Sequence, residues 1–383
     1  MRVLFIRSNS VNPDSRVEKE VLSLRKHDID VDVFCWERES NHNIEKSIKK
    51  LDSYDIDIYR IGIKSVYGAG FKKNLIPLLK FQKYILKFIK THKDEYDIIH
   101  ACDFDTAFTS HKLAKRYGIK FVYDIFDYYV DAFNVPGLLR GIVKGFDERI
   151  MNKSDAIIIC SEERRNQIGK IKQKNILVIH NSPASVNMQK NDLILKELGL
   201  KNENNTAVVN IAYIGILNDS RLIPEILHAI SKNPDFHLYI AGFGKYEADV
   251  KSFSDKYQNI HFFGRISYDK TLAIESYCDI LLAIYDPAVP NHKYAAPNKF
   301  YESLMLGKPL MMVKNTGMSQ YITDNNLGGI IDYSEVSFIN GINELNKRRS
   351  EWASIGIRGK ELYKENFSWE TMEARLINLY KNL

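Results

Sequence analysis

Several features that define whole classes of protein are missing from this sequence. It has only four cysteines, Cys35, Cys102, Cys160 and Cys278, and they lack the paired spacing of a disulfide framework or a zinc site. We therefore expect a reducing compartment and four small core residues. The chain also lacks any run of about eighteen apolar residues, and its N-terminus has only a short one. We expect a cytoplasmic protein that is neither exported nor membrane-spanning.

The chain also lacks a glycine-rich dinucleotide fingerprint after its first apolar run, which argues against a nicotinamide or flavin dinucleotide there. No composition typical of disorder is present. The 383 residues are 45% hydrophobic and 27% charged, enough for two globular domains. Positive charge is uneven: residues 1–180 hold 32 Lys and Arg against 25 Asp and Glu, whereas the whole chain carries +6. The first half is therefore expected to meet an anionic surface or acceptor.

Apolar runs rich in Val, Ile and Tyr recur along the chain with helical stretches between them. Few of these runs alternate apolar with polar residues, and continuous apolar runs are typical of parallel strands covered on both faces. They predict an α/β protein with two doubly wound units. We place the domains at 1–185 and 186–365, with a final helix at 366–383. The predicted strands are residues 2–6, 31–35, 56–61, 97–100, 120–124, 156–160, 176–180, 208–214, 236–241, 260–263, 280–284, 310–313 and 329–332.

The stretch 294–309 has the signals of a helix with a defined start. Pro297 suits the first helical position, so the helix is expected to begin at Asn298 or one residue earlier, and Gly307 suits a left-handed cap. The free N–H groups of the first turn and the helix dipole would form an anion site. Lys299 and Glu302 are three residues apart, so their side chains would lie on the same helix face. A cation and a carboxylate placed together in this way could both contact a phosphorylated sugar. The alternative is an ordinary helix with a solvated ion pair.

This stretch, YAAPNKFYESLMLGKP, resembles the nucleotide-sugar signature of glycosyltransferase family 4. That signature has two glutamates, separated by seven residues, before an apolar Gly-x-Pro segment. The resemblance implies that Glu302, on the second glutamate, holds the ribose hydroxyls of the nucleotide. Tyr294 replaces the first glutamate, so this departure leaves the identity of the sugar open. Pro297 and Asn298 would also contact the donor.

Other segments of the second half resemble the same family in order and spacing. Gly215 ends a strand, and Arg221 lies near the next helix, where it could grip a phosphate. The family usually has two cations here, and Lys299 would be the second. Gly242 lies in a second turn where the lack of a side chain would let a phosphate approach the backbone. The resemblance implies that backbone groups of the corner 263–265 pair with a base such as uracil, through the residues Phe263, Gly264 and Arg265.

The stretch beginning at Asp14 also resembles the family, whose first helix often contains the matching Arg16 and Val17. Arg16 is expected either to face the cleft and contact phosphate or acceptor, or to pair with a carboxylate such as Glu20. In many members a histidine follows a later strand and reaches the donor sugar. Phe126 replaces that histidine here, so Asp127 is expected to contact the sugar or, alternatively, to cap the next helix.

Two further acidic positions lie at strand ends in the first half. Asp103 and Asp105 form an Asp-x-Asp pattern that single-domain glycosyltransferases use to hold a divalent ion. Because a complete nucleotide-binding unit follows downstream, we prefer a reaction without a metal or other cofactor. Asp103 and Asp124 would then line the acceptor side of the cleft.

The segment 71–93 combines lysines with apolar and aromatic residues. Its lysines would lie on one helix face, with Phe81 and Phe88 near them, and could rest on an anionic membrane. The alternative is a core-facing helix with a solvated lysine face. Nucleic acid is disfavoured because no motif supports it. The residues proposed for the membrane contact are Lys72, Lys73, Lys80, Lys83, Lys87 and Lys90.

The resemblance as a whole implies a GT-B fold, with two Rossmann-like domains facing a cleft and the C-terminal helix crossing back to the first. It implies retaining transfer of a hexosyl or N-acetylhexosaminyl group from a nucleotide-diphosphate sugar, such as a UDP-sugar. Jointly with the lysine-rich helix, it implies a glycan or polyprenyl-linked acceptor in bacterial surface polysaccharide synthesis at the inner membrane. Two alternatives remain: a nucleotide-sugar epimerase of the same fold, and a catalytically silent partner subunit.

Overall fold

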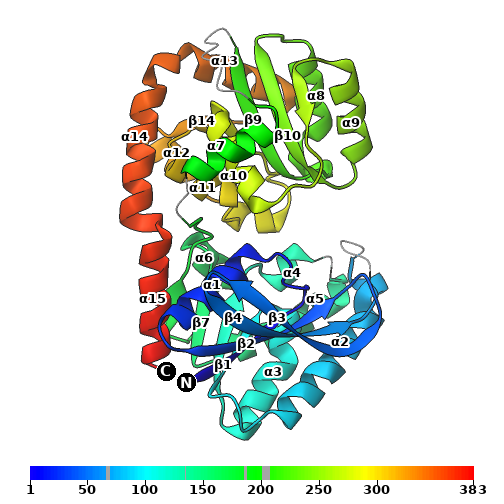
Figure 1. Ribbon diagram of the computed structural model, residues 1–383. Helices are drawn as coiled ribbons and strands as arrows, with labels where there is room; N and C mark the ends of the chain where they lie inside the picture. The colour runs from blue at the N-terminus through cyan, green and yellow to red at the C-terminus, as the bar shows by residue number, and fades with distance from the viewer. Residues whose placement is uncertain (66–69, 134, 185–187, 201–207) are drawn as a thin grey trace. The chain divides into compact units, whose positions relative to one another are not determined.

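The computed structural model describes residues 1–65, 70–133, 135–184, 188–200 and 208–383 (Figure 1). The chain forms two compact units. Unit 1 contains Met1–His180 and Met372–Leu383, and unit 2 contains Asn181–Thr371. The last helix, α15 (Trp369–Lys381), therefore contributes most of its length to unit 1. The domain limits expected from the sequence, after residues 185 and 365, stay a prediction.

Unit 1 is built on one eight-stranded sheet. Its spatial order is β3 (His42–Leu51), β4 (Tyr54–Gly62), β2 (Asp30–Glu37), β1 (Arg2–Arg7), β5 (Ile98–Cys102), β6 (Lys120–Ile125), β7 (Ala156–Ile159) and β8 (Ile176–Val178). All pairs are parallel except β3 with β4. Strand β3 is not among the strands predicted from the sequence. Most of this strand is polar and exposed, so it has no continuous apolar run to reveal it.

Helices flank this sheet (Figure 1). They are α1 (Ser15–Lys26), α2 (Gly70–Thr91), α3 (Phe104–Tyr117), α4 (Tyr129–Ala132), α5 (Gly137–Met151) and α6 (Glu163–Ile168). Helix α1 shows how local chemistry sets a boundary: the Asp14 carboxylate caps it by accepting a hydrogen bond from the Val17 N–H. Val17, Val21 and Leu24 then bury one face of α1. The helix thus begins directly after its cap residue.

Helix α2 corrects one expectation about the lysine-rich segment. Phe81 and Phe88 are buried and stack on Phe34 of the sheet, so they do not belong to the lysine face. Lys80, Lys83, Lys87 and Lys90 are exposed, and the exposed apolar side chains among them include Leu79 and Leu86. Packing explains the difference, because the largest aromatic rings gain most from burial. The side chains of Lys72 and Lys73 lie outside the described residues.

Unit 2 is built on a six-stranded parallel sheet. Its order is β11 (Ile260–Phe262), β10 (Phe236–Phe243), β9 (Val209–Ile216), β12 (Ile280–Ala283), β13 (Leu310–Val313) and β14 (Gly328–Ile331). The core is aliphatic, with Ile211, Leu238 and Ile280 fully buried on adjacent strands. Its α-helices are α7 (Met188–Glu197), α8 (Ile223–Ser231), α9 (Glu247–Lys256), α10 (Tyr268–Tyr277), α11 (Asn298–Leu306), α12 (Ser319–Asp324), α13 (Glu335–Lys347) and α14 (Trp352–Leu362).

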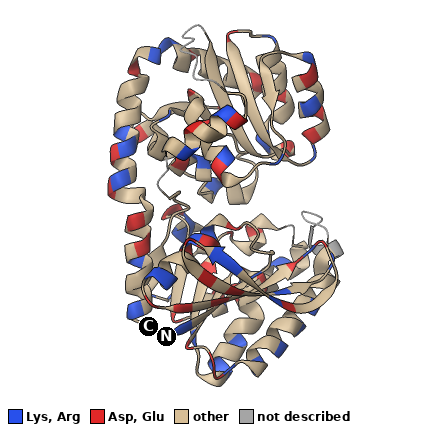
Figure 2. Ribbon diagram, viewed as in Figure 1, with Lys and Arg blue, Asp and Glu red and all other residues tan. Residues whose placement is uncertain are grey.

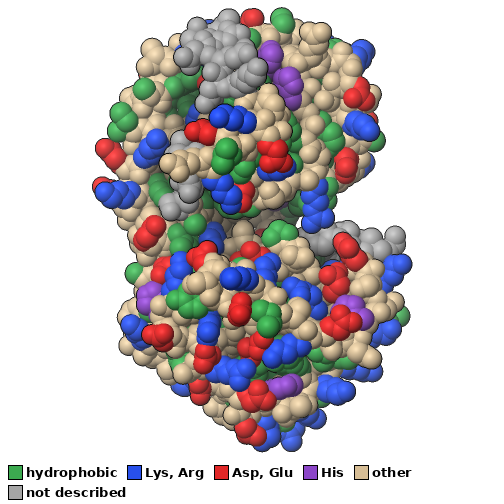
Figure 3. All heavy atoms as spheres, viewed as in Figure 1, with side chains coloured by type: hydrophobic (Ala, Val, Ile, Leu, Met, Phe, Trp, Pro, Cys, Tyr) green, Lys and Arg blue, Asp and Glu red, His purple; other side chains and the backbone are tan. Residues whose placement is uncertain are grey.

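Short helical turns complete unit 2, namely η1 (Asp219–Arg221), η2 (Pro290–Tyr294), η3 (Arg349–Glu351) and η4 (Tyr363–Phe367). The α/β class with two parallel sheets is confirmed. Charged side chains of both signs are spread over the face drawn in Figure 3. In the part of the chain that is described, no helix is long and apolar enough to cross a membrane.

Candidate functional site

Three of the predicted donor-site glycines meet at the carboxyl ends of β9 and β10. Gly215 and Gly242 are partners in the parallel ladder, and the Gly242 N–H donates to the Gly264 carbonyl over 2.8 Å. Gly242 has φ +148°, and a Cβ added there would lie 1.8 Å from the Gly215 oxygen. Only glycine fits this corner without a rearrangement. Carboxyl ends of parallel strands are where α/β proteins bind ligands, so the corner is a candidate donor surface.

Phe263 and Arg265 lie beside this corner. The Phe263 N–H donates to the Ile240 carbonyl, which continues the β10–β11 ladder by one residue. The Arg265 guanidinium lies 4.8 Å from the ring centre of Phe243, at the end of β10. The structure therefore brings the glycine corner and the proposed base-binding residues together. Contact with a base stays a prediction.

Arg221 is held in place by residues that follow β12. Its guanidinium lies 3.9 Å from the ring centre of Tyr285, and its Nη1 lies 3.1 Å from His292 Nε2. His292 Nδ1 lies 2.8 Å from the Asp286 carbonyl oxygen, which can only accept a hydrogen bond. Nδ1 therefore carries the proton, and Nε2 accepts from Arg221. A neutral His292 thus orients the Arg221 cation, a contact that no sequence motif indicated.

The start of α11 matches the expectation from the sequence. Pro297 precedes the first helical residue, Asn298, and Gly307 ends the helix with φ +68°. Two contacts hold the preceding loop. Asn181 Nδ2 donates to the Ala296 carbonyl over 2.9 Å, and Gly317 packs so closely on Ala295 that a Cβ would lie 1.9 Å from its oxygen. Tyr294, at the end of η2, is half-buried.

Lys299 and Glu302 form a buried cluster with Glu275 of α10. Lys299 Nζ lies 2.8 Å from Glu275 and 2.7 Å from Glu302, and neither carboxylate is exposed. Burial and the neighbouring Glu302 raise the pKa of Glu275 to about 8. Burial alone would lower the pKa of Lys299, but the two carboxylates raise it. The solvated-pair alternative for Lys299 and Glu302 is therefore wrong.

The Lys299 side chain is 13% exposed, so its ammonium is not sealed off completely. Glu302 Oε1 is buried and accepts no hydrogen bond from the described residues. Tyr213 links this cluster to Arg221, because Arg221 and Lys299 both lower the pKa of its buried hydroxyl, against the larger effect of burial. Two cations thus lie in the same region of unit 2 as carboxylate oxygens of Glu275 and Glu302 that are buried without a hydrogen bond from the described residues.

In unit 1, Asp103 positions the segment that contains Asp127. Asp103 Oδ1 accepts hydrogen bonds from the backbone N–H groups of Phe126 and Asp127, over 2.9 and 3.1 Å. Its other oxygen binds Arg7 over 2.6 Å. Burial, opposed by Arg7, raises the pKa of Asp103 to about 7. Asp103 is therefore an internal anchor rather than an exposed acceptor contact, because its oxygens already bind the protein.

Asp127 itself is accessible. Its side chain is 52% exposed, and one oxygen lies 3.6 Å from the buried Arg164. Helix α4 begins at Tyr129 after Tyr128 and has no side-chain cap, so the capping alternative for Asp127 is wrong. The role proposed for Asp127 at the donor sugar stays a prediction.

Arg16 and Asp124 do not lie at an exposed acceptor surface, as was expected from the sequence. Arg16 is buried, and its guanidinium lies 2.8 Å from Asp124 and 3.1 Å from Glu20. Glu20 and Asp124 are fully buried too. Of the two interpretations of Arg16, pairing with Glu20 is the one found. The physical reason is mutual neutralisation, since these charges satisfy one another inside unit 1.

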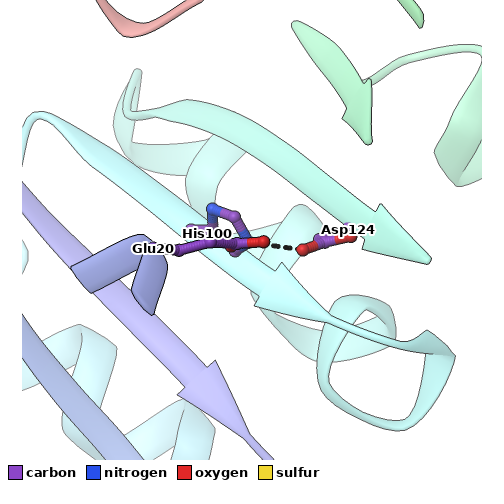
Figure 4. A group of neighbouring side chains, drawn as sticks. All are labelled: Glu20, His100 and Asp124. Atoms are coloured by element: carbon purple, nitrogen blue, oxygen red, sulfur yellow. Dashed lines mark hydrogen bonds and ion pairs between the residues drawn. The ribbon is translucent and has the colours of Figure 1, made fainter. Parts of the chain in front are cut away.

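Glu20, His100 and Asp124 point toward one another from α1, β5 and β6 (Figure 4). Across the described ranges, this is the one group of such side chains close enough to hold a metal ion. Arg16 already supplies a cation to both carboxylates, so the donor set fits an internal ion-pair cluster better than a metal centre. His100 Nδ1 also lies 2.5 Å from the Tyr380 hydroxyl of α15. The cluster therefore ties the last helix to unit 1.

Comparison with known proteins adds three findings. Residues 17–182 match the family model described as Glycosyltransferase Family 4. No match is found among the curated proteins. Solved structures match over the full length. Sucrose-phosphate synthase from Thermosynechococcus elongatus has a TM-score of 0.74 at 15% identity, and the match covers 100% of this chain and 99% of that one.

Two further matches were solved with a bound nucleotide sugar. HepE from Anabaena, in complex with UDP-glucose, has a TM-score of 0.71 at 13% identity, with 100% of both chains covered. A structure titled trehalose-6-phosphate from E. coli, bound with UDP-2-fluoro glucose, has a TM-score of 0.70 at 12% identity, with 99% of both chains covered. At these identities the likeness establishes the fold, which is the GT-B fold.

Proposed function

We propose that this chain, whose residues 17–182 match the model of glycosyltransferase family 4, transfers a hexosyl or N-acetylhexosaminyl group from a UDP-sugar to a glycan or lipid-linked acceptor. The proposed reaction retains the anomeric configuration and needs no bound metal. Support for the donor comes from HepE and the E. coli structure, whose ligands are UDP-glucose and UDP-2-fluoro glucose. UDP-glucose is therefore the first donor to test.

One observation carries the proposal: Arg221 lies 3.1 Å from His292 of η2, the turn that precedes α11, and α11 begins one residue before Lys299. In this proposal the donor diphosphate lies against both cations and the first-turn N–H groups of α11. Negative charge grows on the diphosphate as the glycosidic bond breaks. Cations that are already oriented stabilise that charge more than they stabilise the ground state, which raises the rate.

Glu302 has a separate role in this proposal. One of its oxygens binds Lys299, and the other is buried and makes no hydrogen bond of normal geometry with the described residues, although the Tyr268 hydroxyl faces this carboxylate. A buried carboxylate oxygen left open costs free energy until a donor arrives. A ribose hydroxyl would supply that donor. Glu302 would thus select for a ribonucleotide without taking part in bond breaking.

The other donor residues complete the proposed site. The corner of Gly215, Gly242 and Gly264 would let the nucleotide approach the backbone, and Phe263 and Arg265 would contact the base. Asp127 would contact the donor sugar in place of the family's histidine, since Phe126 occupies that position. No side-chain base is required if the leaving phosphate accepts the proton of the acceptor hydroxyl.

The test measures UDP-glucose binding by calorimetry and transfer kinetics for three variants. Glu302→Ala should weaken nucleotide binding, whereas Arg221→Ala and Lys299→Ala should lower kcat more than donor affinity. Lys232→Ala is the matched control, because Lys232 is exposed at the end of α8. Unchanged kinetics in all three site variants would refute the proposed site.

A silent partner subunit is the second candidate, and the replacements Tyr294 and Phe126 are the observation that favours it. Absence of both donor binding and donor hydrolysis in the wild type would support this alternative. Conversion of the nucleotide sugar without any acceptor would instead indicate an epimerase. Each outcome is distinct from retaining transfer, whose product is a glycosylated acceptor.

We further propose that the protein acts in bacterial surface polysaccharide synthesis at the cytoplasmic face of the inner membrane. The exposed lysines of α2 support this, since Lys80, Lys83, Lys87 and Lys90 all reach the surface between apolar side chains. Each would add on the order of 1 kcal/mol of attraction to an anionic bilayer. Binding of the protein to vesicles rich in phosphatidylglycerol, lost in 0.5 M salt at about a 4 Å screening length, tests this part.

A further inference from the structure

Helix α5 exposes an apolar stripe that nothing in the described part of unit 1 covers. Leu138, Ile142 and Phe146 are 95%, 57% and 44% exposed, and they are spaced four residues apart. Residues at this spacing lie on one helix face, and Arg149 continues it. An exposed apolar stripe bordered by a cation is typical of a surface that meets a partner or a membrane.

Beside this stripe lies a basic cavity of about 340 Å³ between α3 and α5. Phe108 of α3 and Phe146 of α5 both line this cavity. Their rings pack edge-to-face, with ring centres 5.5 Å apart. A second cavity of about 280 Å³ shares several lining residues with the first. The basic residues that line the larger cavity are His111, Lys112, Lys115, Arg149 and Lys153.

The charges of this cavity repel one another. Lys115 and Arg149 lower the pKa of the exposed Lys153, as like charges do at close range. Two neighbouring acidic groups have other partners: Glu148, next to Arg149 in the chain, lies 3.8 Å from Lys144, and Asp155 of the smaller cavity lies 3.0 Å from Lys120. Among the described residues, no ion pair is found for Lys112, Lys115, Arg149 or Lys153. The cluster lacks an anion from the protein itself.

We propose that this α3–α5 surface docks on an anionic lipid bilayer, with a phosphate headgroup in the basic cavity and the apolar stripe of α5 in the acyl region. The charge complementarity argues for a bilayer rather than a protein partner, because cations and exposed apolar side chains lie side by side and acidic groups are neutralised elsewhere. Figure 2 marks the basic positions of unit 1 in blue. This surface is separate from the donor site in unit 2 and from the lysines of α2.

The experiment measures co-sedimentation with phosphatidylglycerol vesicles and with neutral phosphatidylcholine vesicles. Lys115→Gln/Lys153→Gln should reduce the partition coefficient on anionic vesicles by about tenfold or more. Ile142→Ser should reduce this partition coefficient without changing its salt dependence. The substitution removes only apolar area that would be buried in the bilayer, and it changes no charge. The matched control is Lys251→Gln/Lys256→Gln on α9, which removes the same charge from unit 2 and should leave binding unchanged.

Three results would overturn the proposal. Equal binding of the wild type to neutral vesicles would show that charge plays no part. Wild-type binding by the Lys115→Gln/Lys153→Gln variant, with loss in Lys83→Gln/Lys87→Gln, would assign docking to α2 alone. If inorganic phosphate raises the Tm of the wild type but the wild type does not bind vesicles, the cavity is a site for a soluble anion. All four variants should keep wild-type UDP-glucose affinity, so failure here is distinguishable from failure of the proposed donor site.

Discussion

The buried cluster of Glu275, Lys299 and Glu302 makes a sharp prediction about stability and pH. Two carboxylates share one ammonium, so ionisation of both leaves one uncompensated negative charge inside unit 2. Burial and Glu302 raise the pKa of Glu275 from 4.5 to about 8. This difference corresponds to at most about 5 kcal/mol, at 1.36 kcal/mol per pKa unit.

The sign follows from which state binds the proton more tightly. Between pH 4.5 and about 8, the native protein holds a proton on Glu275 that the unfolded chain releases. The stabilisation from this group is therefore complete below pH 4.5 and is lost as the pH rises through about 8. Glu275→Gln places a neutral amide of the same shape there, so Lys299 and Glu302 remain a balanced pair.

Urea denaturation at pH 5, 7 and 8.5 measures the effect. At pH 5 the Glu275→Gln variant and the wild type should agree within about 1 kcal/mol. At pH 8.5 the variant should be more stable, by up to about 5 kcal/mol. Glu361→Gln, on the exposed face of α14, should leave the pH profile unchanged. Parallel pH profiles for Glu275→Gln and the wild type would refute the electrostatic reasoning.

Three further predictions concern two glycines and one buried hydrogen bond. Gly242→Ala should destabilise unit 2 by more than about 3 kcal/mol and abolish UDP-glucose binding in calorimetry, because the new methyl group would meet the Gly215 oxygen. Gly145→Ala, where nothing lies within 4 Å in helix α5, should instead stabilise the protein by about 0.5–1 kcal/mol. Tyr380→Phe should cost about 1–3 kcal/mol in urea denaturation, because it removes the hydroxyl that partners Nδ1 of buried His100. Equal stability of Tyr380→Phe and wild type would mean that this contact does not hold α15.

Local sequence features, each spanning only a few residues, were sufficient to predict many of the helices and strands. Pro297 and Gly307 mark the start and end of α11, because a missing N–H and a left-handed φ are properties of single residues. The buried strands also follow from their composition, since a strand covered on both faces must be apolar throughout. The charged edge strand β3 escaped detection for the same reason, because its exposed face carries no such signature.

The partners of the charged residues were decided by tertiary structure alone. Glu275 and His292 carry no motif, yet they set the environments of Lys299 and Arg221 from other segments of unit 2. Arg16 has a family-like position in the sequence, but its partner Asp124 comes from a distant strand. A local pattern determines which face of a helix is apolar. Whether a charge meets solvent, a ligand or another charge depends on what the fold places against it, and that information is non-local.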